Sequence, residues 1–225
     1  MDLSLQDVAD ALSVSKETIE TLAVTSLIPS YRLAENLRFN RFEVESWMVH
    51  KFQEDKFYSL KKQTRSIGSK RYALTRALAK GMSHYLTDIP TQKQILQVVS
   101  SHIASHLELE TSIVFTELYE RESISSTSIN EYIALPHAKD LINLKADGCI
   151  FVFYLNSNCL FEVEKKIHTL LVPTAKNDSH HLLLMSKLAS FCHEPQNISF
   201  LKTKPTIQNL IHFCMKWESS FNKAT

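Results

Sequence analysis

The chain has 225 residues, of which 44% are hydrophobic and 22% charged, and its net charge is +1; these values are typical of a globular protein with one or two domains. No apolar run approaches the roughly 20 residues of a membrane-spanning helix, and no apolar signal core follows the N-terminus. The 3 glycines exclude the glycine-rich phosphate loops of dinucleotide-binding and P-loop proteins. The four cysteines form no CxxC pair, so we expect reduced thiols and a cytoplasmic protein.

The charged residues are unevenly distributed along the chain. Residues 1–50 contain 4 Lys or Arg and 8 Asp or Glu, whereas residues 51–80 contain 9 and 2. A basic linker, residues 51–71, is therefore predicted between two mildly acidic parts. It is either a solvated linker helix or a segment that contacts the phosphates of nucleic acid.

The first 50 residues predict two short helices, a hairpin and a third helix. Apolar residues recur at helical spacing in residues 5–12 and again in residues 19–27, and Ser15 is a suitable N-cap for the second helix. Residues 31–39 indicate a small hairpin or wing. A capping box at residues 40–43 then opens a helix with an apolar face.

This order of elements resembles the excisionase-like, MerR-related winged helix-turn-helix family, most specifically in LSLQDVADALSVSKETI, IPSYRL and LRFNRFEVESWM. The resemblance predicts a domain at residues 1–50 that binds double-stranded DNA with its second helix in the major groove. The positions that match DNA contacts are Lys16, Thr18, Arg32 and Arg38. Glu17 and Glu20 in the same helix oppose phosphate binding, so the alternative is a dimerisation or protein-docking module.

The rest of the chain mixes predicted helices and strands. Helical spacing begins near Leu74, and further helices are expected at about residues 91–107, 111–121, 179–192 and 206–217. Strand-like runs occur just before Pro136, at residues 148–155 and at residues 167–175. Two of these strands are almost continuously apolar, which predicts an α/β fold whose sheet is covered on both faces.

One stretch, EYIALPHAKD, places a histidine directly after a strand. The apolar run Ile133–Leu135 is stopped by Pro136, and His137 follows at once. Because proline favours an extended residue before it and cannot donate a hydrogen bond to a sheet, we expect His137 just past the strand end, near the surface.

Two longer stretches, LYERESISSTSINEYIALPHAKD and LLVPTAKNDSHHLLLMSKLASF, resemble the type-2 enzyme IIA domain of the bacterial phosphoenolpyruvate-dependent sugar phosphotransferase system, nearest its nitrogen-regulatory and mannitol/fructose branches. The resemblance covers roughly residues 72–222 and implies a three-layer α/β/α domain with a mixed sheet. It implies that His137 accepts a phosphoryl group from an HPr-like phosphocarrier. His181 would support that group, and Arg121 would be the active-site arginine.

These residue types suit phosphoryl transfer, because a neutral imidazole is nucleophilic near neutral pH and a guanidinium offers a planar fork of donors to phosphate oxygens. His180 is the alternative to His181 for this role, because the two are neighbours near the third position of a helix opened by Asp178 and only one can face a given pocket. The family has glycines where this chain has Ser128, Asn130 and Tyr132, so we expect an altered loop before His137.

Metal and cofactor sites are not predicted. His102 and His106 are spaced as a metal-binding pair could be, but no third ligand is identifiable, so a helix-boundary pair is preferred. No cofactor is expected.

The predicted function is that of a regulatory IIA protein, phosphorylated on His137, whose phosphorylation state is coupled to an N-terminal DNA-binding module. It would carry phosphohistidine rather than act on a free small substrate. The alternative is a DNA-binding regulator or a protein-interaction adaptor whose IIA domain is no longer phosphorylated. A homodimer would suit helix-turn-helix binding, but no heptad seam predicts one.

Overall fold

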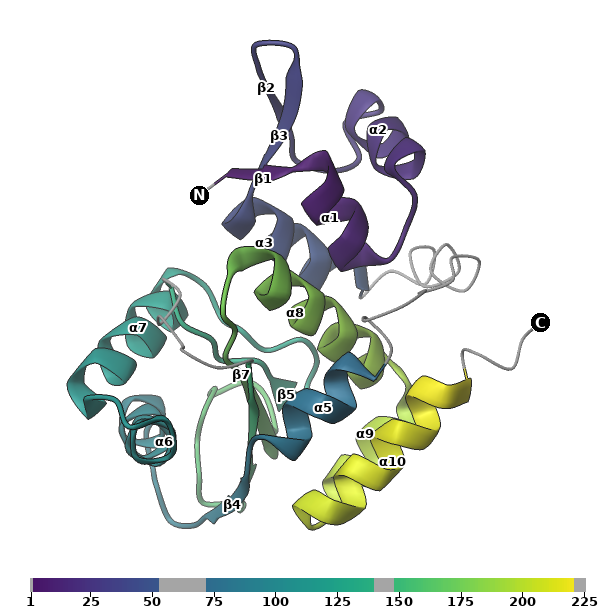
Figure 1. Ribbon diagram of the computed structural model, residues 1–225. Helices are drawn as coiled ribbons and strands as arrows, with labels where there is room; N and C mark the ends of the chain where they lie inside the picture. The colour runs from purple at the N-terminus through teal and green to yellow at the C-terminus, as the bar shows by residue number, and fades with distance from the viewer. Residues whose placement is uncertain (1, 53–71, 140–147, 221–225) are drawn as a thin grey trace.

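The computed structural model describes residues 2–52, 72–139 and 148–220. We call residues 2–52 the N-terminal unit and the other described residues the C-terminal unit (Figure 1). The predicted basic linker, residues 51–71, lies almost entirely outside the described residues. None of the helices in the described part of the chain is long and apolar enough to cross a membrane.

The N-terminal unit contains the predicted helices and hairpin together with one strand that was not predicted. Its elements are β1 (Asp2–Ser4), α1 (Leu5–Leu12), α2 (Lys16–Val24), β2 (Tyr31–Leu33), β3 (Asn36–Asn40) and α3 (Arg41–Phe52). Ser4 and Ser15 cap α1 and α2, and their hydroxyls accept hydrogen bonds from backbone N–H groups in the first turns. β3 pairs antiparallel with β2 and also with β1, so the hairpin belongs to a three-stranded sheet.

The C-terminal unit is built on a mixed four-stranded sheet. Its elements are α5 (Ala73–Ala79), β4 (Ser83–Leu86), α6 (Gln92–Leu107), α7 (Thr111–Ile124), β5 (Ile133–Ala134), β6 (Ile150–Leu155), β7 (Thr169–Pro173), α8 (Asp178–His193), α9 (Pro195–Lys202) and α10 (Ile207–Ser220). The strand order is β4-β6-β7-β5. β4 runs parallel to β6, β5 runs parallel to β7, and β6 and β7 are antiparallel. The predicted mixed sheet is confirmed, whereas β4 and α9 were not predicted.

Both faces of this sheet are buried, as the apolar strands predicted. Along β6, alternate side chains point to opposite faces. Ile150, Val152 and Tyr154 belong to a core with α5, α8 and α10. Phe151, Phe153 and Leu155 belong to a second core with α6 and α7. The unit therefore has three layers, with helices on either side of the sheet (Figure 1).

Helix α8 joins the two units. It packs on the sheet through one side and contacts α1 and α3 of the N-terminal unit through another (Figure 1). Val8, Leu12 and Met48 of the N-terminal unit share one continuous core with Leu184 and Leu188 of α8. A hydrogen bond also connects the two units: the hydroxyl of Ser179, in the first turn of α8, donates to the Asp7 carboxylate at 2.7 Å. The N-terminal unit thus packs near the C-terminal ends of the parallel strands β5 and β7, where the loops that follow these strands begin.

Candidate functional site

His137 lies just past the end of β5, held by the backbone of its own loop. The backbone N–H of Leu135 donates to the carbonyl of Thr127 at 3.0 Å. The Nδ1 atom of His137 lies 2.8 Å from the carbonyl oxygen of Leu135. Because a carbonyl can only accept, the proton of the neutral ring resides on Nδ1, and Nε2 carries the lone pair.

The expected surface position of His137 is wrong: the residue retains 1% of its accessible surface. Helix α3 of the N-terminal unit buries part of the His137 side chain. A strand-end position alone indicates exposure, but a helix from another part of the chain covers this strand end.

Arg121 reaches His137 from the last turn of α7. The helix continues to Ile124, three residues beyond the predicted end, so Arg121 lies inside the helix. Its Nε donates to Nε2 of His137 at 2.9 Å, and its Nη1 donates to the carbonyl and hydroxyl oxygens of Ser125 at 3.1 and 3.2 Å. Burial lowers the pKa of Arg121 and the Glu45 carboxylate partly offsets this, but an arginine stays charged. The guanidinium is therefore a fixed positive charge beside the reactive nitrogen.

His181 faces His137 from the first turn of α8. Asn177 is the N-cap, and its side chain accepts a hydrogen bond from the backbone N–H of His180 at 2.8 Å. His181 is consequently the fourth residue of the helix rather than the third, and its own N–H bonds the carbonyl of Asn177. The rings of His137 and His181 lie 5.2 Å apart, centroid to centroid. His180 instead lines a separate pocket with Arg76 and Lys80.

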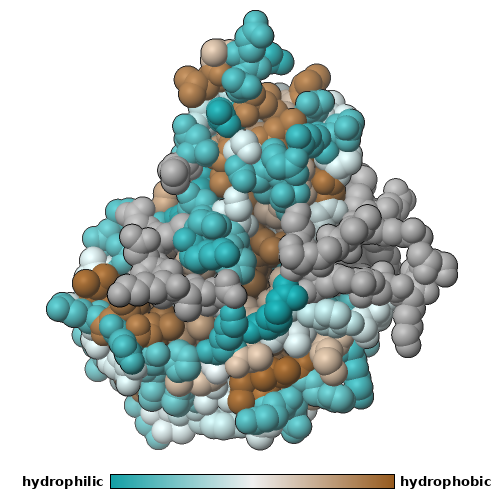
Figure 2. All heavy atoms as spheres, viewed as in Figure 1, coloured by the Kyte–Doolittle hydropathy of each residue, from teal (hydrophilic) through white to brown (hydrophobic). Residues whose placement is uncertain are grey.

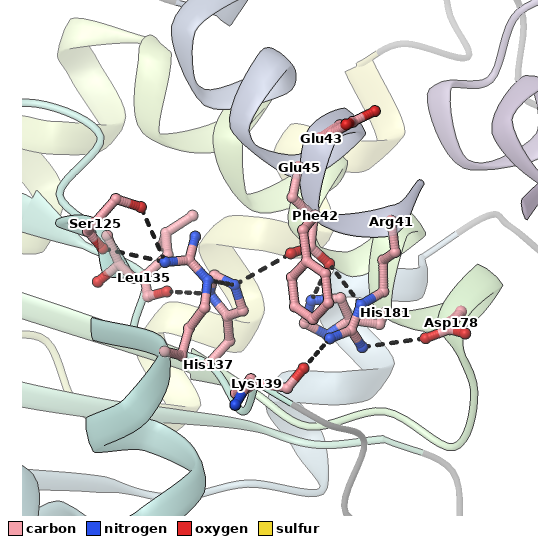
Figure 3. Close-up of polar contacts among 12 residues, drawn as sticks. Arg41, Phe42, Glu43, Glu45, Ser125, Leu135, His137, Lys139, Asp178 and His181 are labelled. Atoms are coloured by element: carbon pink, nitrogen blue, oxygen red, sulfur yellow. Dashed lines mark hydrogen bonds and ion pairs between the residues drawn. The ribbon is translucent and has the colours of Figure 1, made fainter. Parts of the chain in front are cut away.

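Two residues of α3, neither of them predicted, complete the cluster (Figure 3). The Glu45 carboxylate lies between the two imidazoles, with Oε1 3.0 Å from Nε2 of His181 and Oε2 3.4 Å from Nε2 of His137. Nε of Arg41 lies 3.4 Å from Oε1 of Glu45, and its Nη1 lies 3.1 Å from Oδ1 of Asp178. Nη2 of Arg41 donates to the carbonyl of Lys139. These residues place part of the N-terminal unit inside the site.

Glu45 is an ionised carboxylate in a buried setting. Burial is the largest single influence and would raise its pKa, but attraction to His181 and contacts with both imidazoles together outweigh burial and hold the pKa well below the ordinary value for glutamate. Within the described residues, neither carboxylate oxygen receives a hydrogen bond of normal geometry. The two imidazoles and the guanidinium of Arg41 lie close enough to compensate the charge.

The same cluster offers ligand atoms for a metal ion, but its charges favour an anion. One ligand atom from each of Glu45, His137 and His181 lies within 4.8 Å of the others. However, Arg121 already donates to Nε2 of His137, and Arg41 lies beside Glu45. A cation would have to enter between two fixed positive charges, which would repel it. The charges of the site therefore suit an anion better than a cation.

The other histidine pair, His102 and His106, does not converge on a common ligand. The ring of His102 stacks on His84 at 3.9 Å, whereas Nε2 of His106 lies 2.9 Å from the carbonyl oxygen of Lys80. The two side chains have separate structural partners.

The loop before His137 adopts ordinary backbone geometry without glycine. None of Ser128, Asn130 and Tyr132 has a positive φ, so their side chains impose no strain there. The Asn130 side-chain oxygen accepts hydrogen bonds from the backbone N–H groups of Tyr132 and Ile133, both at 2.9 Å. The Ser128 hydroxyl donates to Glu162 and accepts from Lys165. Side-chain hydrogen bonds therefore hold this loop, and its difference from the glycine-containing loop of the family stays a prediction.

Glu122, for which the sequence predicted no role, fixes the start of this loop. Its carboxylate accepts hydrogen bonds from the backbone N–H and the hydroxyl of Thr127 at 3.1 and 2.6 Å. The Thr127 carbonyl in turn receives the N–H of Leu135. Glu122 thus connects the helix that carries Arg121 to the strand end that carries His137.

The four predicted DNA contacts lie elsewhere, on the N-terminal unit. Lys16, Arg32 and Arg38 line one groove of about 480 Å³ between α2 and the β2–β3 hairpin. Glu20 and Glu35 line the same groove. Thr18 is not among its lining residues, and its hydroxyl instead lies 3.1 Å from that of Ser15 at the helix N-cap. Figure 1 shows this hairpin projecting away from the C-terminal unit.

Sequence comparisons relate the C-terminal unit to a known family. Residues 78–216 match the family described as "Phosphoenolpyruvate-dependent sugar phosphotransferase system, EIIA 2". The mannitol-specific phosphotransferase enzyme IIA component of Geobacillus stearothermophilus is 26% identical over 96 residues, which cover 42% of this chain and 66% of that relative. The alignment therefore spans slightly less than two thirds of the relative.

Solved structures share the fold at low sequence identity. The nitrogen regulatory protein IIA-Ntr from Neisseria meningitidis superposes with a TM-score of 0.53 at 16% identity, covering 62% of this chain and 97% of that one. A putative PTS IIA domain from Streptococcus pyogenes M1 GAS gives a TM-score of 0.54 at 12% identity, with coverage of 65% and 97%. Because the family match alone spans more than half of the chain, this protein belongs to the type-2 enzyme IIA family of the phosphoenolpyruvate-dependent sugar phosphotransferase system.

Proposed function

We propose that this protein is a regulatory IIA component that accepts a phosphoryl group on Nε2 of His137 from an HPr-like phosphocarrier and passes it on or holds it as a signal. The observation that carries the proposal is the pair of contacts made by the two ring nitrogens of His137, from which the tautomer is inferred. Its Nδ1 proton faces a carbonyl oxygen, and its Nε2 lone pair faces the guanidinium of Arg121. Phosphocarrier proteins are the partners of IIA domains in general, and they act in the cytoplasm, where we expect this protein to act.

The phosphoryl transfer follows from these contacts. The lone pair of Nε2 forms a bond to phosphorus while the bond between phosphorus and the donor nitrogen breaks, and the donor nitrogen keeps the electron pair. His137 retains its Nδ1 proton, so the ring gains positive charge that the carbonyl of Leu135 stabilises. Arg121 lies beside Nε2, where its donors can stabilise negative charge on the phosphoryl oxygens. The neighbouring imidazole of His181 lies within reach of the same group.

A phosphorelay reaction tests this proposal. The full chain is incubated with phosphoenolpyruvate, enzyme I and an HPr-type carrier, and intact mass and site mapping are measured at alkaline pH. We expect one phosphoryl group, located on His137, and no labelling of His137→Gln. His193, at the other end of α8, supplies the control substitution His193→Gln, which should label normally. Equal labelling of wild type and His137→Gln would contradict the assigned acceptor.

We further propose that the N-terminal unit contacts double-stranded DNA and that its activity is coupled to the state of His137. Support comes from Lys16, Arg32 and Arg38, which gather around one groove on the side remote from the phosphoryl site. Phosphate contacts by Lys and Arg supply most non-specific affinity for DNA. The carboxylates of Glu20 and Glu35 in the same groove weaken this attraction.

The second candidate, docking of another protein, is favoured by a different observation. The N-terminal unit exposes large apolar side chains near this groove: Val24, Leu27, Tyr31 and Leu33. Figure 2 shows brown apolar patches among the hydrophilic residues on this unit. Exposed apolar groups of this kind are common at protein interfaces.

Salt dependence of DNA binding separates the two candidates. If the groove binds DNA, the full chain should bind duplex at low salt, and Arg38→Ala should weaken binding and reduce the slope of log K against log salt by about 1. Arg76→Ala, an exposed residue on α5 of the other unit, serves as the matched control. Absence of binding at low salt, both for the phosphorylated and the unphosphorylated chain, would favour protein docking.

A further inference from the structure

Helix α3 of the N-terminal unit occupies the position where a phosphoryl group on His137 would have to lie. The Glu45 carboxylate reaches from this helix to within 3.4 Å of Nε2 of His137 and 3.0 Å of Nε2 of His181 (Figure 3). All three side chains retain 2% or less of their accessible surface. Among the described residues, this carboxylate covers the Nε2 lone pair, so a donor reaches it only after the carboxylate moves.

The Glu45 carboxylate resembles the phosphoryl group that it excludes. Glu45 places two negatively charged oxygens among the positive groups that suit a phosphoryl group. Arg41 lies beside one oxygen at 3.4 Å, and Arg121 lies next to His137 and attracts the carboxylate. An anion held between imidazoles and guanidiniums is stabilised by the same charges whether it is a carboxylate or a phosphate.

The contact between the Glu45 carboxylate and the histidines also has a geometry that favours its release from the site. A buried charge is costly unless directed hydrogen bonds compensate it. Among the described residues, the oxygens of Glu45 lie 3.0 and 3.4 Å from imidazole nitrogens, but neither contact has the geometry of a full hydrogen bond. Most of the remaining attraction comes from the neighbouring charges, so any added negative charge at His137 acts directly against it.

We propose that Glu45 is an intramolecular stand-in for the phosphoryl group, so that docking of α3 and phosphorylation of His137 exclude each other. This inference rests on the proposed function of His137. In the unphosphorylated chain, α3 covers the acceptor and lowers its rate of phosphorylation. Once Nε2 carries a phosphoryl group, the group and the Glu45 carboxylate compete for the same space and the same cations, and like charges repel. Helix α3 then leaves the site and carries the N-terminal unit with it, which changes what that unit can bind.

The rate of labelling tests the proposal in the full chain. We compare wild type, Glu45→Ala and Glu43→Ala, using both the phosphorylated carrier and phosphoramidate, a small donor that needs no docking surface. Glu43 lies two residues earlier on the same helix, exposed and pointing away from the site (Figure 3), so its substitution matches the change of charge. Glu45→Ala should be labelled about tenfold faster or more with both donors, because a minor open state is commonly populated at about 0.1–10%. Glu43→Ala should keep the wild-type rate.

Hydrogen exchange provides the second measurement. Phosphorylation of the wild-type chain should raise the exchange of α3 amides while the amides of β6 keep their protection. Glu45→Ala should raise α3 exchange without any phosphorylation, which tests the contact independently of the acceptor chemistry.

The outcomes that overturn the proposal are distinct. Equal labelling rates for all three chains, or unchanged α3 exchange after phosphorylation, would overturn the switch while leaving the acceptor intact. If Glu45→Ala is labelled faster by the carrier but not by phosphoramidate, α3 obstructs docking of the carrier rather than access to Nε2. That result would overturn the role of the Glu45 carboxylate. Failure of every chain to label with either donor would overturn the proposed function of His137 and the switch with it.

Discussion

Replacement of Arg121 by lysine is expected to slow phosphorylation of His137 by about 100- to 1,000-fold, the usual cost of removing one aligned donor to a developing oxyanion. Arg121 presents a planar fork that bonds His137 through Nε and Ser125 through Nη1 at the same time. A lysine ammonium retains the charge but not the fork, and its flexible stem cannot hold both contacts. The loss therefore measures geometry rather than charge.

The measurement requires a background without Glu45, because Arg121 also attracts that carboxylate. Single-turnover labelling by the phosphorylated carrier is compared for Glu45→Ala with and without Arg121→Lys, so that any loosening of α3 does not mask the chemical effect. Arg76→Lys in the same background is the control, since Arg76 is exposed on α5. Thermal unfolding of each chain separates a slower reaction from a destabilised fold. Labelling of Arg121→Lys at the control rate would contradict the role assigned to this arginine.

The elements that the sequence predicted are those with long periodic patterns. Helix α6 has a threonine cap and apolar residues at helical spacing over four turns, and β6 is apolar throughout because both of its faces are buried. Local sequence and tertiary packing agree in these segments. By contrast, β4 has four residues, and its identity as a strand depends on pairing with β6. Helix α9 is short and follows another helix after a single capping residue; Pro195 at its first position was the one local signal of a helix start, and it was missed.

The sequence predicted those residues of the candidate site that lie in the two stretches resembling the enzyme IIA family. His137, Arg121 and His181 stand in such stretches, and the structure brings their side chains together. Their catalytic roles remain predictions. Burial of His137 was not predictable from its strand-end position, because the cover comes from a helix more than 80 residues earlier in the chain. A contact of that sequence separation leaves no local pattern.

One signal for Glu45 was nevertheless present. Arg41, Glu45 and Met48 are spaced four and three residues apart, which places two charged residues and an apolar one on the same face of α3. Charged residues on a face that should be buried are uncommon unless they are paired or functional. The pattern indicates a polar contact beneath this helix but does not identify the partner.

Replacement of Arg41 by methionine is expected to weaken the docking of α3 by about 3–5 kcal/mol, the typical cost of removing one partner from a buried ion pair. Arg41 is buried, and its guanidinium neutralises Glu45, pairs with Asp178 and donates to the carbonyl of Lys139. Methionine fills much of the same volume, so the loss reflects charge and hydrogen bonding more than packing. Exchange of α3 amides should rise by about 100-fold or more, since each 1.4 kcal/mol corresponds to a factor of ten. The amides of β6 should exchange as in the wild type.

A double substitution identifies which partner causes this loss. Arg32→Met, on the exposed hairpin, controls for the removal of one positive charge and should leave α3 protected. If the unpaired Glu45 carboxylate dominates the cost, Arg41→Met combined with Glu45→Ala should be better docked than Arg41→Met alone, because removing both members of a buried pair costs less than removing one. If Asp178 and the Lys139 carbonyl dominate instead, the double substitution should dock no better than Arg41→Met alone. Unchanged protection of α3 in Arg41→Met would show that apolar packing against α8 holds the N-terminal unit without the charge cluster.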